Sequence, residues 1–445
     1  MMTTAALSEL ELFQALLERY FAQIGADDPL RKVRNKAWDH FLELGLPTRT
    51  AEVFRYIRLR PFFARSFEPA AAASPSLQAI APFVYPECSR SVIVSVNGRY
   101  CPALSNTQAL SPKLSIAPLD VAIRTFGAFL NNQWAKTLKE EVDPFAAVNA
   151  ALHTDGIFLY IPPKLQIEVP IQLLNIVDTG DQMAMFMPRT HVFAGGQSEV
   201  SLYATTAVLS GRGYCINQVS DLFLEEGARV KFMQVNTDAA ADSWHFDAVR
   251  ASLKRDSSFK SMSVTNGSMM VRNDYKATLT GENGEVLLNG VWMLDEKREA
   301  HTHILMEHQA PHCQSRQLFK GVLSDISRSS FEGKILVRRA AQKTEAYQLN
   351  HNLVLSDRAS ADSKPNLEIF ADDVKATHGA TVGQLDQEQL FYLKARGCDE
   401  AESMLVYGFC KEVLDMFPLP SLQKEFTKRV QNYLKKTPFK PKRAE

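Results

Sequence analysis

The sequence predicts a mainly β protein with a helical region at each end. Three observations support this class. Apolar residues recur at helical spacing near the N-terminus, short β-type runs separated by turn residues fill the middle, and capped helical patterns follow near the C-terminus. We therefore divide the chain into an N-terminal helical domain (1–85), a mixed α/β connecting region (86–154), a β core (155–380) and a C-terminal helical domain (381–445).

The N-terminal region carries two helical patterns. The first has apolar residues at Leu10, Phe13, Leu17 and Phe21. The second begins near Pro29 and ends at Gly45, and its apolar stripe is Trp38, Phe41, Leu42 and Leu44. An apolar stripe needs a partner to cover it, so we expect these segments to form a small helical bundle.

The connecting region predicts one strand and two helices. The run Val92–Tyr100 has β-type residues and contains the turn pair Asn97-Gly98. A helical pattern follows over about 121–138. A second, shorter helix is expected over 143–153, because Asp143 precedes a proline at the helix start.

From Asp155 onward the chain has the pattern of an all-β domain. Its β-type runs are 157–161, 171–176, 200–203, 230–235, 261–264, 286–292, 335–337 and 353–355. Clusters of Gly, Asn, Asp and Ser lie between them. Many short strands suit a sandwich, a barrel or a solenoid, and periodicity alone does not choose among these. The sequence has no strict internal repeat, which argues against the solenoid.

The end of the β core predicts a strand followed by a turn. Leu367, Ile369 and Val374 indicate a half-buried strand. The small residues of 375–383 predict a tight turn, in which His378 is the one imidazole.

Two helices are predicted after this turn. Asp386 and Gln389 have the spacing of a capping box, and Gly397 fits the left-handed position past the end of the first helix. Asp399 and Glu402 repeat the capping-box spacing for the second helix.

The chain is expected to end in a third helix and a polar tail. Pro418 stops the second helix, and Ser421 can cap the third. The tail 435–443 is basic and interrupted by prolines, so we expect it to be solvated and partly disordered.

Composition restricts the class of function. Lysine plus arginine and aspartate plus glutamate each number 50, which argues against a protein that mainly binds nucleic acid or an anionic membrane. The start of the chain lacks a basic region followed by an apolar run, and no apolar run is long enough to span a bilayer. The six cysteines form no C-x-x-C pair, so we expect reduced thiols and a cytoplasmic location.

One segment is rich in metal-binding side chains. His301, His303, His308, His312 and Cys313 fall close together, and imidazole and thiolate suit zinc, iron and copper. Alternation places His301 and His303 on the same face of a strand, but the other residues need a specific fold-back to join them. A structural role is therefore favoured over a metal site.

Motifs for enzymatic chemistry are missing from the sequence. Gly333-Lys334 is followed by Ile335, so it is not a phosphate-binding loop, and there is no G-x-S-x-G or H-E-x-x-H motif. We therefore expect no enzymatic activity. The pair Asp372-Asp373 leaves open a carbohydrate-active enzyme built on a β-helix.

Three strings in the C-terminal third resemble the SufB/SufD family, the β-helical subunits of the Suf machinery for iron–sulfur cluster assembly. They are PNLEIFADDV (365–374), HGATVG (378–383) and LFYLKARG (390–397). The resemblance covers most of the chain and is strongest over about 318–413. It implies a right-handed parallel β-helix core flanked by α-helical domains.

The resemblance also implies a site for iron and a branch of the family. His378 matches the histidine of a Cys-x-His pair where a nascent cluster forms between SufB- and SufD-type subunits, and Ala376 takes the cysteine position. Alanine has no donor for iron, so the chain is most similar to the SufD type. Its own contribution is then limited to an imidazole or to Asp372 or Asp373. No cofactor is expected to bind stably, and an iron–sulfur cluster or iron is expected only transiently, at the subunit interface.

Two partner surfaces follow from the same resemblance. The edge near Leu367, Ile369 and Val374 is expected to pair with a SufB-type subunit, or with a second copy in a homodimer when the partner is missing. The surface for a SufC-type ATPase is expected at Leu390, Phe391, Tyr392, Arg396 and Gly397. A stand-alone homodimeric iron–sulfur scaffold is the alternative.

Overall fold

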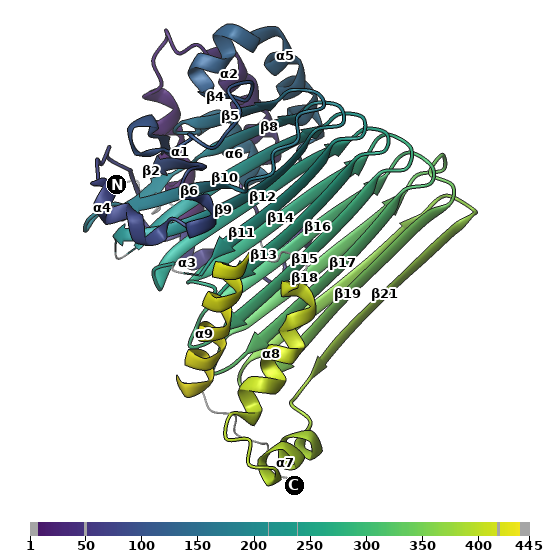
Figure 1. Cartoon of the computed structure of the whole chain (residues 1–445). Helices are drawn as coiled ribbons and strands as arrows, with labels where there is room; N and C mark the ends of the chain where they lie inside the picture. Colours follow the sequence, from purple (N-terminus) through teal and green to yellow (C-terminus); the bar gives the residue numbers. More distant parts are fainter. Residues whose placement is uncertain (1–7, 49–50, 212, 238, 416–418, 437–445) are drawn as a thin grey trace, which may run out of the picture.

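The computed structural model describes residues 8–48, 51–211, 213–237, 239–415 and 419–436, and the middle of the chain forms a parallel β-helix. Figure 1 shows the strands stacked as successive rungs, with helices near both ends of the chain. The chain alternates between two sheets, so each rung contributes one strand to each. The prediction of a β-helical core with helical ends is confirmed.

Sheet A holds β5 and, from β8 onward, the even-numbered strands of the solenoid. After β4 (Ser115–Pro118), which pairs antiparallel with β5, its order is β5 (Gly156–Ile161), β8 (Arg189–Ala194), β10 (Gly213–Leu224), β12 (Asp242–Leu253), β14 (Met270–Leu279), β16 (Glu299–His308), β18 (Arg328–Val337) and β20 (Ser360–Ile369). The short strands β1 (Glu68–Pro69) and β7 (Ala184–Phe186) pair with each other beside β10. From β5 to β20 every pairing is parallel.

Sheet B lies opposite and ends at the same rung. It begins with the hairpin of β2 (Val92–Val96) and β3 (Arg99–Tyr100). It continues through β6 (Ile171–Asp178), β9 (Glu199–Ser210), β11 (Arg229–Asn236), β13 (Ser258–Thr265), β15 (Glu285–Leu294), β17 (Gln314–Leu323), β19 (Thr344–Val354) and β21 (Val374–Gly383). The predicted turn at Asn97-Gly98 is confirmed, since both residues have positive φ.

A repeated corner turn stacks the rungs where the chain passes from sheet A to sheet B. From the turn before β6 to the turn before β19, each has one residue in the left-handed region, namely Lys164, Gln197, Gly227, Asp256, Asn283, His312 and Lys343. The backbone N–H of each donates to a carbonyl of the next turn, as His312 does to Gln342. Many polar residue types tolerate this conformation. The repeat is therefore visible in the backbone and not in the sequence, and its absence from the sequence was no evidence against a solenoid.

Alternation along each strand separates the lumen from the outer faces. On β11, Val230 and Phe232 point into the core between the sheets, whereas Met233 and Val235 pack under the C-terminal helices. The same period of two holds for the other rungs, because parallel pairing in register keeps each row on one face.

Helices cover part of each outer face. α1 (Glu9–Ala22), α2 (Arg31–Leu44), α5 (Leu119–Glu140) and α6 (Pro144–Leu152) share a core with the outward residues of sheet A. α8 (Ala401–Leu414) and α9 (Pro420–Lys436) share a core with the outward residues of sheet B. These helices agree with the predicted ones, and Asp143 caps α6 by accepting from the N–H groups of Phe145 and Ala146.

The remaining helices are short. They are η1 (Glu52–Phe54), α3 (Arg60–Phe63), α4 (Leu77–Ile80), η2 (Ala81–Phe83), η3 (Pro86–Cys88), η4 (Pro102–Leu104) and α7 (Gln387–Ala395). Asp386 caps α7, and Gly397 has φ +79 beyond its end, both as predicted. Among the described helices, none is long and apolar enough to cross a membrane.

Several local predictions were wrong. Residues 375–383 form the regular strand β21 and not a turn, and Val374 belongs to β21 and not to the strand that carries Leu367. The residue before α8 is Glu400 rather than Asp399, and it makes no side-chain cap. Ser421 lies inside α9. Most of the tail predicted to be disordered, 437–443, and the stop at Pro418 lie outside the described residues.

Candidate functional site at the open terminal rung

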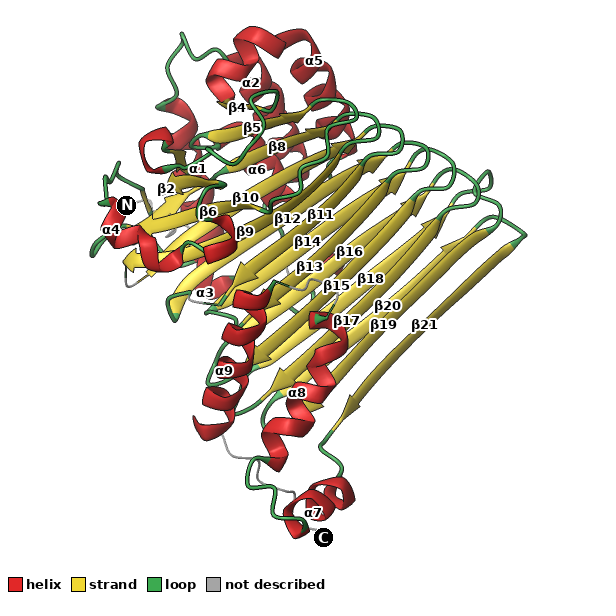
Figure 2. Ribbon diagram, in the orientation of Figure 1, coloured by secondary structure: helices red, strands yellow, loops and turns green. Residues whose placement is uncertain are grey.

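The last rung leaves two strand edges open. β20 ends sheet A and β21 ends sheet B, and within the described residues each pairs along one side only, with β18 and β19. Figure 2 shows the two strands together at the end of the solenoid away from α1, α2 and α5. An unpaired edge presents a row of free N–H and C=O groups to any strand that can approach it.

The two edge strands differ in their chemistry. β20 carries Pro365 and the charged residues Asp362, Lys364 and Glu368, which are features that protect an edge from pairing. β21 has the sequence VKATHGATVG, so Lys375 is its one charged residue, and that ammonium group pairs with Glu345 at 3.1 Å. β21 is therefore the less protected edge.

His378 lies on the lumen-facing row of β21, at the mouth of the solenoid. It is in register with Gln348 on β19, which is in register with Gln317 on β17. The Gln348 amide is buried and donates to Gln317 Oε1 at 2.8 Å, while its own Oε1 has no partner within the described chain. Ala376, two residues before His378, packs against the lumen core. The lumen-facing row of residues thus ends at the exposed imidazole of His378, beside the methyl group of Ala376.

Asp372 and Asp373 lie at the turn into β21 and not beside His378. The chain from Asp373 to His378 is extended, and five residue steps separate the two by about 16 Å. From the sequence, these carboxylates were an alternative to the imidazole, and the structure places them apart from it, at the start of β21.

The predicted edge residues fall on both strands of the terminal rung. Leu367 on β20 and Val374 on β21 are half-buried and pack against the lumen core, whereas Ile369 at the end of β20 is exposed. The first two therefore close the mouth of the lumen, and Ile369 is free to meet a partner.

The histidine-rich segment is not assembled into one cluster. His301 bonds to Ser330 and Glu299, His303 bonds to Asp274, and His308 bonds to Ser315 Oγ at 2.9 Å. Cys313 is buried and donates to the carbonyl of Gly281. In the described part of the chain, no three His, Cys, Asp or Glu residues come together as a metal site. His301, His303, His308 and Cys313 each have a hydrogen-bond partner within the protein.

α7 lies apart from the two sheets, near the C-terminal end of the chain (Figure 1), and it carries exposed aromatic side chains. The exposed fractions of Phe391 and Tyr392 are 75% and 57%, and the guanidinium of Arg396 stacks on Tyr392 at 5.1 Å. Leu390 is only 6% exposed and anchors α7 in the C-terminal core. Of the predicted docking residues, Leu390 is therefore not available to a partner, while the other four are exposed.

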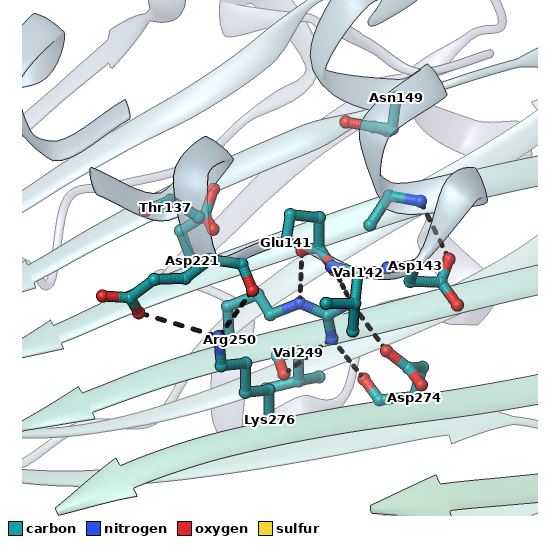
Figure 3. Close-up of polar contacts among 12 residues, drawn as sticks. Thr137, Glu141, Val142, Asp143, Asn149, Asp221, Val249, Arg250, Asp274 and Lys276 are labelled. Carbon is teal, nitrogen blue, oxygen red and sulfur yellow. Dashed lines mark hydrogen bonds and ion pairs between the residues drawn. The ribbon is translucent and has the colours of Figure 1, made fainter. Parts of the chain in front are cut away.

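A buried network of charges joins the helical region to sheet A, and sequence reasoning missed it. Arg250 on β12 pairs with Glu141 at 2.7 Å and with Asp274 at 2.6 Å, as Figure 3 shows. Arg272 pairs with Asp274 at 2.9 Å and with Asp143, the cap of α6, at 2.6 Å. The sequence signal was charged residues on the outward row of otherwise apolar strands.

The network extends along the sheet. Arg189 on β8 pairs with Asp221 at 2.8 Å and donates to Asn149 on α6. His191 accepts from the indole N–H of Trp134 on α5 at 2.9 Å. Burial raises the pKa of Asp221, although Arg189 opposes this effect. Burial acts in the same direction on Asp274, but Arg272 and Arg250 hold the pKa of Asp274 well below its usual value. These contacts fix α5 and α6 on the solenoid.

Comparison with known proteins gives two family matches. Residues 176–409 match the family model described as SUF system FeS cluster assembly, SufBD core domain, and residues 8–173 match the SufBD protein N-terminal region.

Individual relatives are similar over most of their lengths. A SufBD family iron–sulfur cluster assembly protein of Synechocystis is 30% identical over 423 residues, which cover 92% of both chains. The iron–sulfur cluster assembly protein SufD of Escherichia coli is 28% identical over 396 residues, covering 87% of this chain and 89% of the relative. SufD of Bacillus subtilis is 27% identical over 307 residues, covering 67% and 68%.

Proposed function

The chain belongs to the SufBD family of iron–sulfur cluster assembly proteins, and from this premise we propose that it is the non-catalytic SufD-type subunit of a SufBCD complex. The observation that carries the proposal is the open edge of β21, where His378 is exposed and Ala376 supplies no thiolate. A cluster needs several ligands, and thiolates are the usual ones. A SufB-type partner on this edge would supply them.

Pairing through this edge would extend both sheets of the solenoid into the partner. The parallel rungs here leave ten-residue strands at the end of each sheet, and β21 carries one charge, which is already paired within the chain. A second copy of this chain offers the same edge, so a homodimer is the alternative in the absence of a SufB-type subunit. The mass of the native assembly, measured with and without that subunit, distinguishes the two.

The His378 side chain is expected to take part in cluster assembly on the complex. His378→Ala removes the exposed imidazole that this chain places at the mouth, so cluster assembly should fall on the order of tenfold or more. The measurement is anaerobic cluster assembly by the co-purified complex, followed by its visible absorption. Thr377→Ala is the matched control, because Thr377 is the exposed neighbour on the opposite face. Equal rates for the two variants would assign His378 to a structural role.

A SufC-type ATPase would dock on α7 and α8. α8 packs on the outer face of β15 and β17, where Lys320 Nζ donates to the Phe409 carbonyl at 2.9 Å and pairs with Glu412 at 2.8 Å. Movement of the ATPase on nucleotide binding would therefore act on sheet B two rungs from the open edge. This gives a subunit without chemistry of its own a mechanical role.

Truncation of the α7 aromatics is expected to weaken this docking. Phe391→Ala combined with Tyr392→Ala removes two exposed rings. Loss of such aromatic anchors typically costs about 2 kcal/mol or more of binding free energy, so the dissociation constant should rise about thirtyfold. Calorimetric titration with the ATPase measures it. Leu77→Ala, which removes an equally exposed apolar side chain elsewhere, should leave the affinity unchanged. An unchanged affinity in the double variant would place the docking surface elsewhere.

A further inference from the structure

The first rungs of the solenoid enclose a polar cavity in the lumen. It is lined by residues of β2, β3, β6, β9 and β11 from sheet B and of β5, β8, β10 and β12 from sheet A. Small residues such as Ala204, Thr206 and Ser220 occupy lumen positions that larger apolar side chains fill in later rungs. The open volume is about 50 Å³, more than the ~10–15 Å³ that one water molecule needs.

Three buried polar atoms on the walls have no partner within the described residues. They are Oδ1 of Asp247, Oδ1 of Asn236 and Nδ2 of Asn175. Asp247 is 5% exposed, Asn236 7% and Asn175 8%. Buried polar groups in proteins are nearly always hydrogen-bonded, and an unpaired buried charge costs far more than an unpaired amide. Unpartnered atoms on the walls of one cavity therefore indicate a bound polar species.

The contacts of these residues show which atoms are free to bind it. Asn236 donates through Nδ2 to His245 Nδ1 at 2.7 Å, and Asn175 Oδ1 accepts from Ser95 Oγ at 3.1 Å. Asp247 is in register with Gln218 on β10 and Asn273 on β14, which are both neutral. Two of the three free atoms are therefore oxygens, one of them from a carboxylate, and these are the ligands that hard cations prefer. The third, Asn175 Nδ2, is an N–H donor and would not bind a cation.

We propose that this cavity is a binding site for a small monovalent cation, Na⁺ or K⁺, held by the Asp247 carboxylate together with amide and hydroxyl oxygens of the cavity wall. We infer a monovalent rather than a divalent cation, because the single Asp247 carboxylate neutralises one positive charge. Arg189 contributes to the rim, but its guanidinium pairs with Asp221 on the outer face of the sheet. The proposal does not rest on the role of the chain in cluster assembly.

The other titratable groups that face the cavity stay neutral near pH 8. Burial lowers the pKa of His245 to about 3, and burial raises the pKa values of Tyr275 and Tyr100 above that of a free tyrosine. Burial also raises the pKa of Asp247 to about 7, although Gln218 opposes this with a side-chain hydrogen bond. Protons and the cation therefore compete for Asp247, and the cation should bind better above about pH 7 than below it.

The test compares the melting temperature of the full chain in NaCl or KCl with that in choline chloride at equal ionic strength. At about pH 8 the wild type should melt roughly 2 °C higher with the alkali cation. A shift of this size is expected when the cation concentration is about tenfold above the dissociation constant of the site. Asp247→Asn should remove the difference. Asp256→Asn, which changes an exposed carboxylate in a corner turn, should retain it. Equal melting temperatures of the wild type in all three salts would overturn the proposal, as would a response retained by Asp247→Asn.

A second measurement needs no variant. The ²³Na NMR line of a NaCl solution should broaden on addition of the wild-type chain at about pH 8, and K⁺ should reverse the broadening if both ions share the site. The broadening should be lost at about pH 5.5, because a proton then occupies Asp247. A line width that does not respond to the chain, or that is the same at the two pH values, would contradict the site.

Discussion

Replacing Arg250 with alanine is expected to lower the free energy of unfolding by about 3–5 kcal/mol. The guanidinium is buried and pairs with Glu141 from the helical region and with Asp274 from the neighbouring strand. Its removal leaves two carboxylates without their nearest cation inside the protein. Urea denaturation followed by circular dichroism measures the loss.

The control for Arg250 is an arginine at the surface. Arg255→Ala breaks an exposed pair with Glu226, which water and salt screen, so it should lower the free energy of unfolding far less than Arg250→Ala does. If Arg250→Ala were as mild as Arg255→Ala, the network in Figure 3 would not stabilise the joint between the helices and the solenoid.

The same network predicts how stability depends on pH. Arg272 and Arg250 hold the pKa of Asp274 in the folded state well below its unfolded value, despite the opposing effect of burial. The stabilisation is therefore complete above the unfolded pKa and is lost as the pH falls through the folded one. The difference between the wild type and Arg250→Ala should shrink in acid.

Charges placed on the open rung are expected to prevent assembly with a SufB-type subunit. Ile369→Lys combined with Val382→Lys puts one ammonium group on each edge strand, at side chains that are 37% and 55% exposed. Burying two unpaired charges in the joint would cost several kcal/mol, so the affinity should fall more than about a hundredfold. Co-purification of co-expressed subunits measures it.

The matched control places the same charges far from the edge. Leu77→Lys combined with Val121→Lys changes two exposed apolar residues, 60% and 47% exposed, near the other end of the solenoid. The control should co-purify like the wild type, and both double variants should melt near the wild-type temperature. A stable complex formed by the edge variant would exclude β20 and β21 as the joint.

Local chemistry was enough to predict the elements that are stabilised by nearby residues. Asp143 and Asp386 accept from N–H groups two or three residues away, so the starts of α6 and α7 could be predicted from spacing. The same reasoning was wrong at Asp399, because α8 begins after Glu400 and is held by its packing on sheet B. Strand positions in the core also followed from local pattern.

The candidate site could be predicted only in part. Motif resemblance identified His378 and the missing thiol at Ala376, but not Gln348, which lies in the same row thirty residues earlier. The buried network could not be predicted from the sequence. Arg250 and Glu141 are 109 residues apart, and neither residue type indicates that its partner is buried.

The sequence by itself determined the mainly β class, the helical ends, several helix starts and the family. Only the tertiary structure decided that residues 375–383 are an edge strand and that the charges of sheet A are paired beneath the helices. The reason is physical. The Gly and Ala residues of β21 weaken the local preference that its Val and Thr residues have for a strand. The strand forms because β19, in the preceding rung, offers a full row of backbone hydrogen bonds.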